Sequence, residues 1–67
     1  MANMALLRER INESGIKMSV LAERCGLTYQ GLWRKLRGET EFRVPEMQAI
    51  KDTLHLETDE VMDIFFN

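Results

Sequence analysis

The sequence lacks the covalent and metal-based supports that many small proteins use. Its 67 residues contain one cysteine, Cys25, and one histidine, His55. A single cysteine cannot close an internal disulfide, and these two side chains do not supply the ligand set of a structural zinc site. Chains of this length bury only about 60% of the surface that they expose when unfolded. We therefore expect one domain, over residues 1–67, that is held together by side-chain packing.

Several kinds of segment are also missing. No apolar run approaches the ~20 residues that cross a bilayer, and the first residues, MANMALLRER, lack the apolar stretch of a secretory signal peptide. No segment alternates apolar and polar residues over the length of a strand, and no nucleophile with a matching base, metal-ligand cluster or repeat is present. These absences predict a cytoplasmic, all-α protein without enzymatic activity, cofactor, metal or small-molecule ligand.

The net charge of -2 conceals two halves of opposite sign. Residues 1–38 hold seven basic and three acidic side chains, a net charge of +4, whereas residues 39–67 hold two basic and eight acidic ones, a net charge of -6. Such an asymmetry favours binding of a polyanion by the basic half. It indicates a nucleic-acid partner, although charge alone does not establish one.

Apolar residues recur at helical spacing in five segments. The expected helices cover residues 3–14, 18–25, 29–37, 45–54 and a last segment that begins at Thr58. Residues suited to N-capping stand at the start of three of them: Asn3, Thr28 and Thr58. Gly15 is expected in a left-handed conformation after the first helix, and Phe42 is expected to attach the polar loop 39–43 to the core. The predicted fold is an all-α, compact five-helix domain.

The junction between the second and third expected helices distinguishes this chain from an arbitrary helical bundle. A helix-turn-helix that enters a major groove needs two helices that cross steeply over a turn of three or four residues. It needs a small residue where the two helices approach most closely and a turn residue that can adopt positive φ. It also needs an apolar residue after the turn that packs between the helices, an N-cap for the second helix and an aliphatic residue that packs this helix on the core. The chain offers these in order: Ala22, Gly26, Leu27, Thr28 and Leu32.

This pattern resembles the helix-turn-helix of the Cro and phage-repressor proteins, also called the XRE family. The resemblance rests on Leu21-Ala22, on Gly26-Leu27-Thr28 four positions later, and on Leu32. It extends to Leu36-Arg37-Gly38 and to the final Ile64-Phe65-Phe66, as in short prophage-type regulators. The resemblance implies a lambda-repressor-like DNA-binding fold with the motif at about residues 18–37.

Two positions depart from the family pattern. Met18 stands where the family often has a glutamine that touches a backbone phosphate, so this contact passes to Lys17 or Ser19, or is absent. Lys35 occupies a position that is commonly aliphatic, and the apolar anchor moves to Leu36. This shift would rotate the third helix slightly about its axis.

The third expected helix would present one side to DNA. At about 100° per residue, Leu32 and Leu36 define its buried side, and Gln30, Arg34 and Arg37 lie opposite. Glutamine pairs with adenine and arginine with guanine, each contact giving ~1–3 kcal/mol of discrimination. Together with the resemblance, this predicts four base-contacting residues: Thr28, Tyr29, Gln30 and Arg34. The predicted DNA-backbone contacts are Lys17, Ser19, Trp33, Lys35, Arg37, Thr40 and Arg43.

Plainer interpretations stand beside these assignments. Arg34 and Arg37 could be solvated surface charges, and Trp33 could pack against the first helix or the loop 39–43. Gly31 in mid-helix costs ~1 kcal/mol of helix stability relative to alanine. Close approach of DNA to the backbone would explain a glycine here, and so would neutral sequence drift. Cys25 is expected to be a small buried hydrophobe beside the turn.

The function expected from these features is sequence-specific binding of double-stranded DNA by a small, phage-related transcription regulator. A monomer of this size contacts only a few base pairs, so a homodimer is expected. Ile64, Phe65 and Phe66 could form its interface; in the alternative, the first two close the core and only Phe66 remains for a partner.

A second class of function stays open. The chain could be a protein-interaction module, such as an antirepressor or an antitoxin-like partner, that keeps the fold without sequence readout. Met18 and the acidic residues 39–67 favour this alternative slightly.

Overall fold

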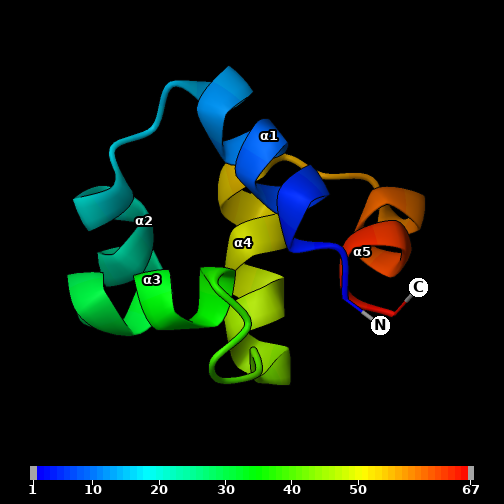
Figure 1. The fold of residues 1–67 in the computed structure, drawn as a ribbon. Coiled ribbons are helices and arrows are strands. Elements are labelled where there is room, and N and C mark those ends of the chain that lie inside the picture. The colour runs from blue at the N-terminus through cyan, green and yellow to red at the C-terminus, as the bar shows by residue number, and fades with distance from the viewer. Residues whose placement is uncertain (1, 67) are drawn as a thin grey trace.

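A computed structural model describes residues 2–66 and contains five α-helices joined by short connections (Figure 1). They are α1 (Met4–Ser14), α2 (Met18–Arg24), α3 (Tyr29–Leu36), α4 (Val44–Leu54) and α5 (Thr58–Phe65). No strand occurs among the described residues. The predicted all-α fold is confirmed, and each helix boundary that was predicted lies within one residue of its expected place.

The helix starts are satisfied by local hydrogen bonds. The Leu6 N–H donates to Asn3 Oδ1 at 3.0 Å, and the Gly31 N–H donates to Thr28 Oγ1 at 2.9 Å, which confirms both predicted caps. The prediction that Thr58 caps the last helix is wrong. Thr58 is the first residue of α5, and the preceding Glu57 N–H donates to Glu60 Oε1 at 3.0 Å. A carboxylate three residues into a helix takes over this backbone donor in the manner of a capping box.

The core lies where the five helices meet. Its largest fully buried side chains come from every helix: Leu7, Leu21, Leu32, Leu36, Ile50 and Ile64. The loop between α3 and α4 joins the core through Phe42, whose ring packs edge-to-face on Phe65 with centroids 5.4 Å apart. The predicted attachment of this loop by Phe42 is confirmed. The Cα radius of gyration is 10.5 Å, close to the roughly 11 Å expected of a compact domain of this length.

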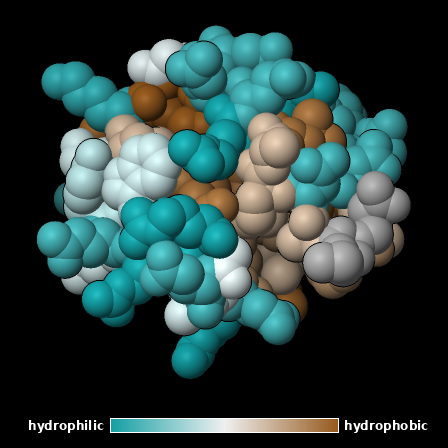
Figure 2. Space-filling view, viewed as in Figure 1, coloured by the Kyte–Doolittle hydropathy of each residue, from teal (hydrophilic) through white to brown (hydrophobic). Residues whose placement is uncertain are grey.

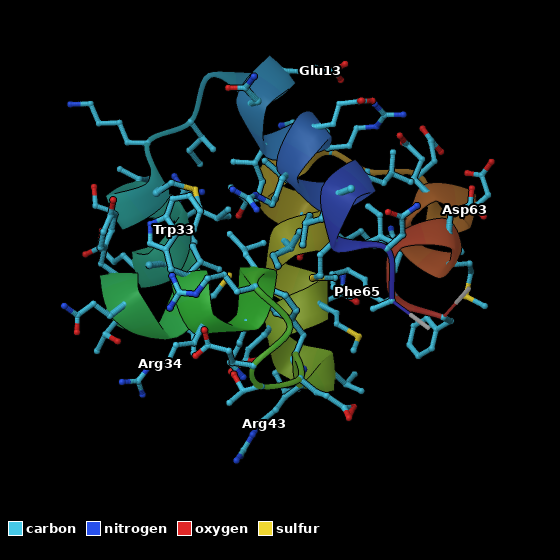
Figure 3. The ribbon with its side chains drawn as sticks, in the orientation of Figure 1. Glu13, Trp33, Arg34, Arg43, Asp63 and Phe65 are labelled. Atoms are coloured by element: carbon cyan, nitrogen blue, oxygen red, sulfur yellow. The ribbon has the colours of Figure 1, made fainter. Side chains whose placement is uncertain are left out.

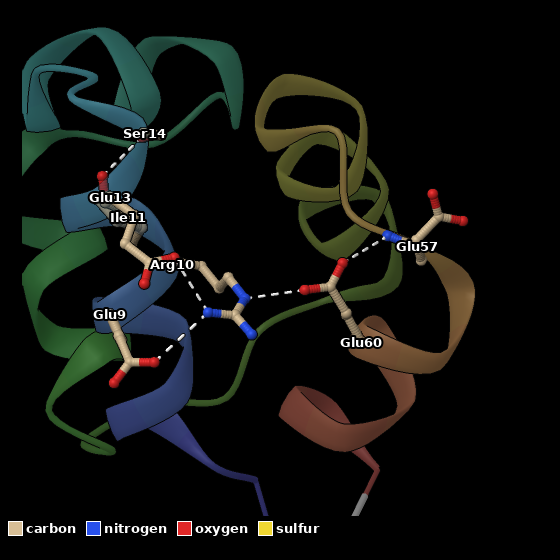
Figure 4. A network of polar contacts seen from close by, with 7 residues as sticks. All are labelled: Glu9, Arg10, Ile11, Glu13, Ser14, Glu57 and Glu60. Carbon is tan, nitrogen blue, oxygen red and sulfur yellow. Dashed lines mark hydrogen bonds and ion pairs between the residues drawn. The ribbon is translucent and has the colours of Figure 1, made fainter.

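The two ends of the described chain lie beside each other. Figure 1 places the N-terminal segment next to α5, and the Asn3 N–H donates to the Ile64 carbonyl at 2.6 Å. Further along the same helices, Arg10 Nε donates to Glu60 Oε2 at 2.8 Å, and the Arg10 guanidinium also pairs with Glu13 and Glu9 (Figure 4). The first and last helices are therefore joined by both a backbone bond and an ion-pair network.

Gly26 sets the path of the chain between α2 and α3. Its φ of +72° lies in the left-handed region, and a Cβ at this position would meet nothing within 4 Å. The cost of a side chain here is therefore a backbone cost, about 1–2 kcal/mol for an L-residue other than glycine or asparagine.

Gly26→Ala is accordingly expected to lower the free energy of unfolding by about 1–2 kcal/mol, measured by urea denaturation followed by circular dichroism. Gly26→Asn is the matched control and should lose less, because asparagine tolerates this conformation. Equal losses in the two variants would contradict the backbone explanation.

Candidate nucleic-acid interface

The side chains that the sequence predicts to pack between α2 and α3 are buried or partly buried. Leu21 and Ala22 of α2 are buried, Leu27 is partly buried, and Leu32 of α3 is fully buried. The Leu27 N–H donates to the Ala22 carbonyl at 2.9 Å across the turn made by Gly26. These contacts hold α3 by one side and leave its opposite side to solvent.

The four predicted base-contacting residues gather at that free side. Thr28, Tyr29, Gln30 and Arg34 are all exposed and belong to the cap and first two turns of α3. Figure 3 shows Arg34 projecting away from the body of the protein. The Thr28 oxygen also accepts the Gly31 N–H, so the cap and the predicted contact surface share this residue.

Some of the basic side chains form ion pairs within the protein, and others do not. Among residues 2–66, ion pairs within 4.0 Å involve three basic side chains: Arg10, Lys35 and Arg37. The Arg37 pair with Glu39, at 2.8 Å, is half exposed, so water and salt weaken it and Arg37 can exchange partners. The described basic residues outside these pairs are Arg8, Lys17, Arg24, Arg34, Arg43 and Lys51.

Lys35 differs from the exposed basic residues because its side chain is largely buried and ion-paired. Its Nζ lies 2.9 Å from Glu46 Oε1, with the two side chains 11% and 12% exposed, and it also donates to the Glu41 carbonyl at 2.8 Å. The ammonium lies 5.8 Å from the Phe42 ring centroid. The Lys35 side chain is thus accommodated by a carboxylate on α4, and its charge is directed inward.

Glu46 is a residue whose role the sequence did not reveal. Burial is the largest influence and raises the pKa of its carboxyl, but the Arg43 N–H, which donates at 2.8 Å, and Lys35 outweigh it. The net pKa of Glu46 is therefore below the ordinary value of 4.5. The useful signal would have been Lys35 itself, because a lysine on the apolar side of a helix needs an acidic partner.

The other predicted backbone-contact residues surround α3. Lys17 and Ser19 are exposed at the start of α2, and Thr40 and Arg43 are exposed between α3 and α4. Figure 3 shows Arg43 projecting on the same side of the molecule as Arg34. In the space-filling view, hydrophilic (teal) side chains and pale ones of intermediate hydropathy form the part of the surface where α2 and α3 lie (Figure 2).

Trp33 lies beside the first helix, which is one of the two packing positions proposed for it as alternatives to DNA contact. Its half-buried ring faces α1 across an open groove, and the Arg8 guanidinium carbon lies 5.5 Å from the ring centroid. One turn earlier on α3, Tyr29 meets Trp33 edge-to-face with centroids 6.4 Å apart. Trp33 therefore lies between the exposed start of α3 and the side of α1.

The contacts of Gly31 and Cys25 bear on the interpretations of these two residues. A Cβ at Gly31 would lie 2.9 Å from Thr28 Oγ1, so the absence of a side chain there already has a cause within the protein, namely room for the cap. Cys25 is half-buried, and burial, followed by the proximity of Glu46, raises the pKa of its thiol. A raised pKa favours the protonated thiol, which is the less nucleophilic form, at neutral pH.

The C-terminal residues predicted as a dimer surface separate into two groups. Ile64 is fully buried and Phe65 is 8% exposed, so both close the core, as the alternative interpretation held. Phe66 is 58% exposed, and Met62, four residues earlier on α5, is 51% exposed. Only this pair remains available to a partner at the C-terminal end of the described chain.

Within residues 2–66, no three His, Cys, Asp or Glu side chains form a group that could hold a metal ion. None of the helices α1 to α5 is long and apolar enough to cross a membrane. In comparisons with known proteins, no family model, no curated protein and no solved structure matches this chain.

Proposed function

We propose that this protein is a sequence-specific, double-stranded DNA-binding regulator of transcription that places α3 in the major groove. The observation that carries the proposal is the exposed set Tyr29, Gln30 and Arg34 on a helix whose opposite side is fully buried. Gln30 suits adenine and Arg34 suits guanine, since each side chain can make two hydrogen bonds to the major-groove edge of that base. The resemblance to Cro-type proteins agrees with this arrangement and makes a phage-related regulator acting in a bacterial cytoplasm the expected context.

Backbone contacts are assigned to the exposed residues around α3. Lys17 and Ser19 would meet one strand from the start of α2, while Arg37, Thr40 and Arg43 lie at the other end of α3. Phosphate contacts fix the position of a protein on the duplex without selecting a sequence. Lys35 is left out of the proposed interface because its ammonium is paired with Glu46.

Arg34→Ala tests the proposal. Duplexes selected from a random pool by the wild-type chain should share a motif, and Arg34→Ala should lower the affinity for the best of them by about 1–3 kcal/mol and abolish the preference at one base pair. The helix content should not change, because Arg34 is exposed and outside the ion pairs. Fluorescence anisotropy gives the affinities, and circular dichroism gives the helicity.

Arg24→Ala is the matched control for this experiment. Arg24 is also an exposed arginine outside the ion pairs, but it lies at the end of α2, so its removal should leave the selected motif unchanged. Failure of the wild-type chain to enrich any sequence at low salt would exclude the proposed function. An Arg34→Ala variant with unaltered base preferences would exclude the assigned role of this residue.

Useful specificity requires more than one copy on the DNA. A single domain of this size contacts few base pairs, and two copies on a symmetric site would double the number. Phe66, with Met62 beside it on α5, is the proposed contact between the copies. A palindromic selected motif would agree with this part of the proposal, and a single asymmetric half-site bound by one copy would contradict it.

A second candidate function is a protein-interaction module. The observation that favours it is the exposed pair formed by Met62 of α5 and Phe66, which directly follows this helix; α5 also carries the exposed acidic residues Asp59 and Asp63. The two functions predict different outcomes of the selection experiment, because an interaction module would enrich no duplex. It would also lose its partner on Met62→Glu, whereas Arg34→Ala would leave that partner bound.

A further inference from the structure

Arg8 is a basic residue beside the proposed interface that the sequence did not single out. It belongs to α1, yet its guanidinium carbon lies 5.5 Å from the centroid of Trp33 on α3. Trp33 in turn meets Tyr29 in the first turn of α3. Arg8, Trp33 and Tyr29 thus form a continuous row from the side of α1 to the exposed start of α3. A cation held over an indole ring has lost part of its side-chain freedom before any ligand arrives.

The row borders an open groove of about 590 Å³ between α1, the start of α2 and Trp33. Its lining includes Ala5, Arg8, Asn12, Ile16, Met18 and Trp33. Glu9 also reaches the groove, but its carboxylate pairs with Arg10 at 3.4 Å. Arg8 is exposed and takes part in no described ion pair, so its hydrogen-bond donors face the groove and solvent.

Met18 makes this groove important for the proposed function. It replaces a glutamine that, in the family resembled, often touches a backbone phosphate, and its thioether offers no hydrogen-bond donor. Met18 and Trp33 line the same groove as Arg8. An arginine from α1 therefore borders the place from which the expected donor is missing.

We infer that Arg8, positioned by Trp33, binds a phosphate of the DNA strand that runs along this groove; this inference rests on the proposed function. The guanidinium is suited to the task because it presents several N–H donors in one plane and stays charged at every physiological pH. Its position over the Trp33 ring places the guanidinium beside α3, whose first turn carries Tyr29 and Gln30, the residues that would meet the bases. A phosphate contact adds affinity and fixes the register of the protein, and it does not choose the base sequence.

Arg8→Gln tests this inference, with Arg24→Gln as the matched control that removes the same charge from the end of α2. Binding of each variant to the duplex selected by the wild-type chain is measured by anisotropy between 50 and 300 mM salt, values on the order of physiological ionic strength. Arg8→Gln should weaken binding about five- to tenfold near 0.1 M salt and reduce the slope of log affinity against log salt by about 0.9. Arg8→Gln should lower the affinity for a duplex with one mismatched base pair by the same factor as for the selected duplex. The affinity of Arg24→Gln should remain within about twofold of that of the wild-type chain.

A second substitution separates positioning from charge. Arg8→Lys keeps the charge but presents it as a flexible point donor, so it should restore the salt slope while recovering only part of the affinity. Circular dichroism establishes that all variants remain folded.

The inference is overturned if Arg8→Gln matches Arg24→Gln in both affinity and salt slope while the wild-type chain binds its selected duplex. It is also overturned if Arg8→Gln changes the selected base sequence rather than the affinity for all duplexes. Absence of any duplex binding by the wild-type chain would overturn the proposed function together with the role of Arg8.

Discussion

Leu32→Ala is expected to lower the free energy of unfolding by about 2–5 kcal/mol, the range for leucine truncation in a packed core. Leu32 has no exposed surface and comes from the middle of α3, where it packs in the cluster that includes Leu7, Leu21 and Ile50. The whole domain is expected to be stable by only about 3–10 kcal/mol, given its 67 residues. Loss of this one side chain can therefore unfold a large share of the molecules at 25 °C.

Thermal and urea denaturation followed by circular dichroism measure this loss. Val44→Ala is the control, because Val44 is 71% exposed and its truncation should change the free energy by about 0.5 kcal/mol or less. A loss below about 1 kcal/mol for Leu32→Ala would show that α3 is not fastened to the body through this residue. Since Leu32 holds the helix that carries Gln30 and Arg34, its truncation should also abolish the proposed DNA binding.

Glu46→Ala is expected to lower the free energy of unfolding by about 2–4 kcal/mol, somewhat less than for a fully buried ion pair because 12% of the Glu46 side chain is exposed. The truncation leaves the Lys35 ammonium without its partner at 2.9 Å and leaves the Arg43 N–H without its acceptor. Adding Lys35→Leu should recover most of the loss, because it removes the unpaired charge and places an aliphatic side chain at a largely buried position of α3. Failure of the second substitution to recover stability would contradict this account.

The ion pair between Lys35 and Glu46 makes the stability of the folded protein depend on pH. The pKa of Glu46 in the folded protein is below 4.5, so the stability that ionised Glu46 contributes is complete above that value and disappears as the pH falls through the lower, folded pKa. The pKa of Glu60 is lowered in the same direction, first by the Glu57 N–H and then by Arg10. Urea denaturation of the wild-type protein between pH 6 and pH 3 should show decreasing stability. The variant with both Lys35→Leu and Glu46→Gln should lose less over the same interval.

The sequence was sufficient to locate the helices and to predict two of the three expected caps at their starts. Apolar spacing located all five helices, and the caps at Asn3 and Thr28 follow from side chains that hydrogen-bond within their own turn. Thr58 was misassigned because two adjacent residues compete for the same cap. Glu60 decides the outcome by accepting the Glu57 N–H, and the order of residues alone does not rank these competing bonds.

The candidate site was harder to predict where it depends on contacts between helices. The exposure of Gln30 and Arg34 follows from periodicity within α3, but the inward position of Lys35 depends on Glu46, which reaches it from another helix. The same holds for Arg8, whose place over Trp33 exists only because α1 packs beside α3. A pattern along one helix does not reveal these partners, since their proximity is created by the tertiary fold.

The link between the first and last helices has a consequence for the order of events during protein synthesis. Arg10 and Glu60, 50 positions apart, are ion-paired, and the Asn3 N–H requires the Ile64 carbonyl. Glu60 and Ile64 do not exist until the ribosome has made the segment that contains α5. Closing a loop of that length carries an entropic cost that local helix formation does not offset by itself. We therefore expect the contacts of α1 to be completed only after α5 has emerged, even though α1 also packs against α3 and α4.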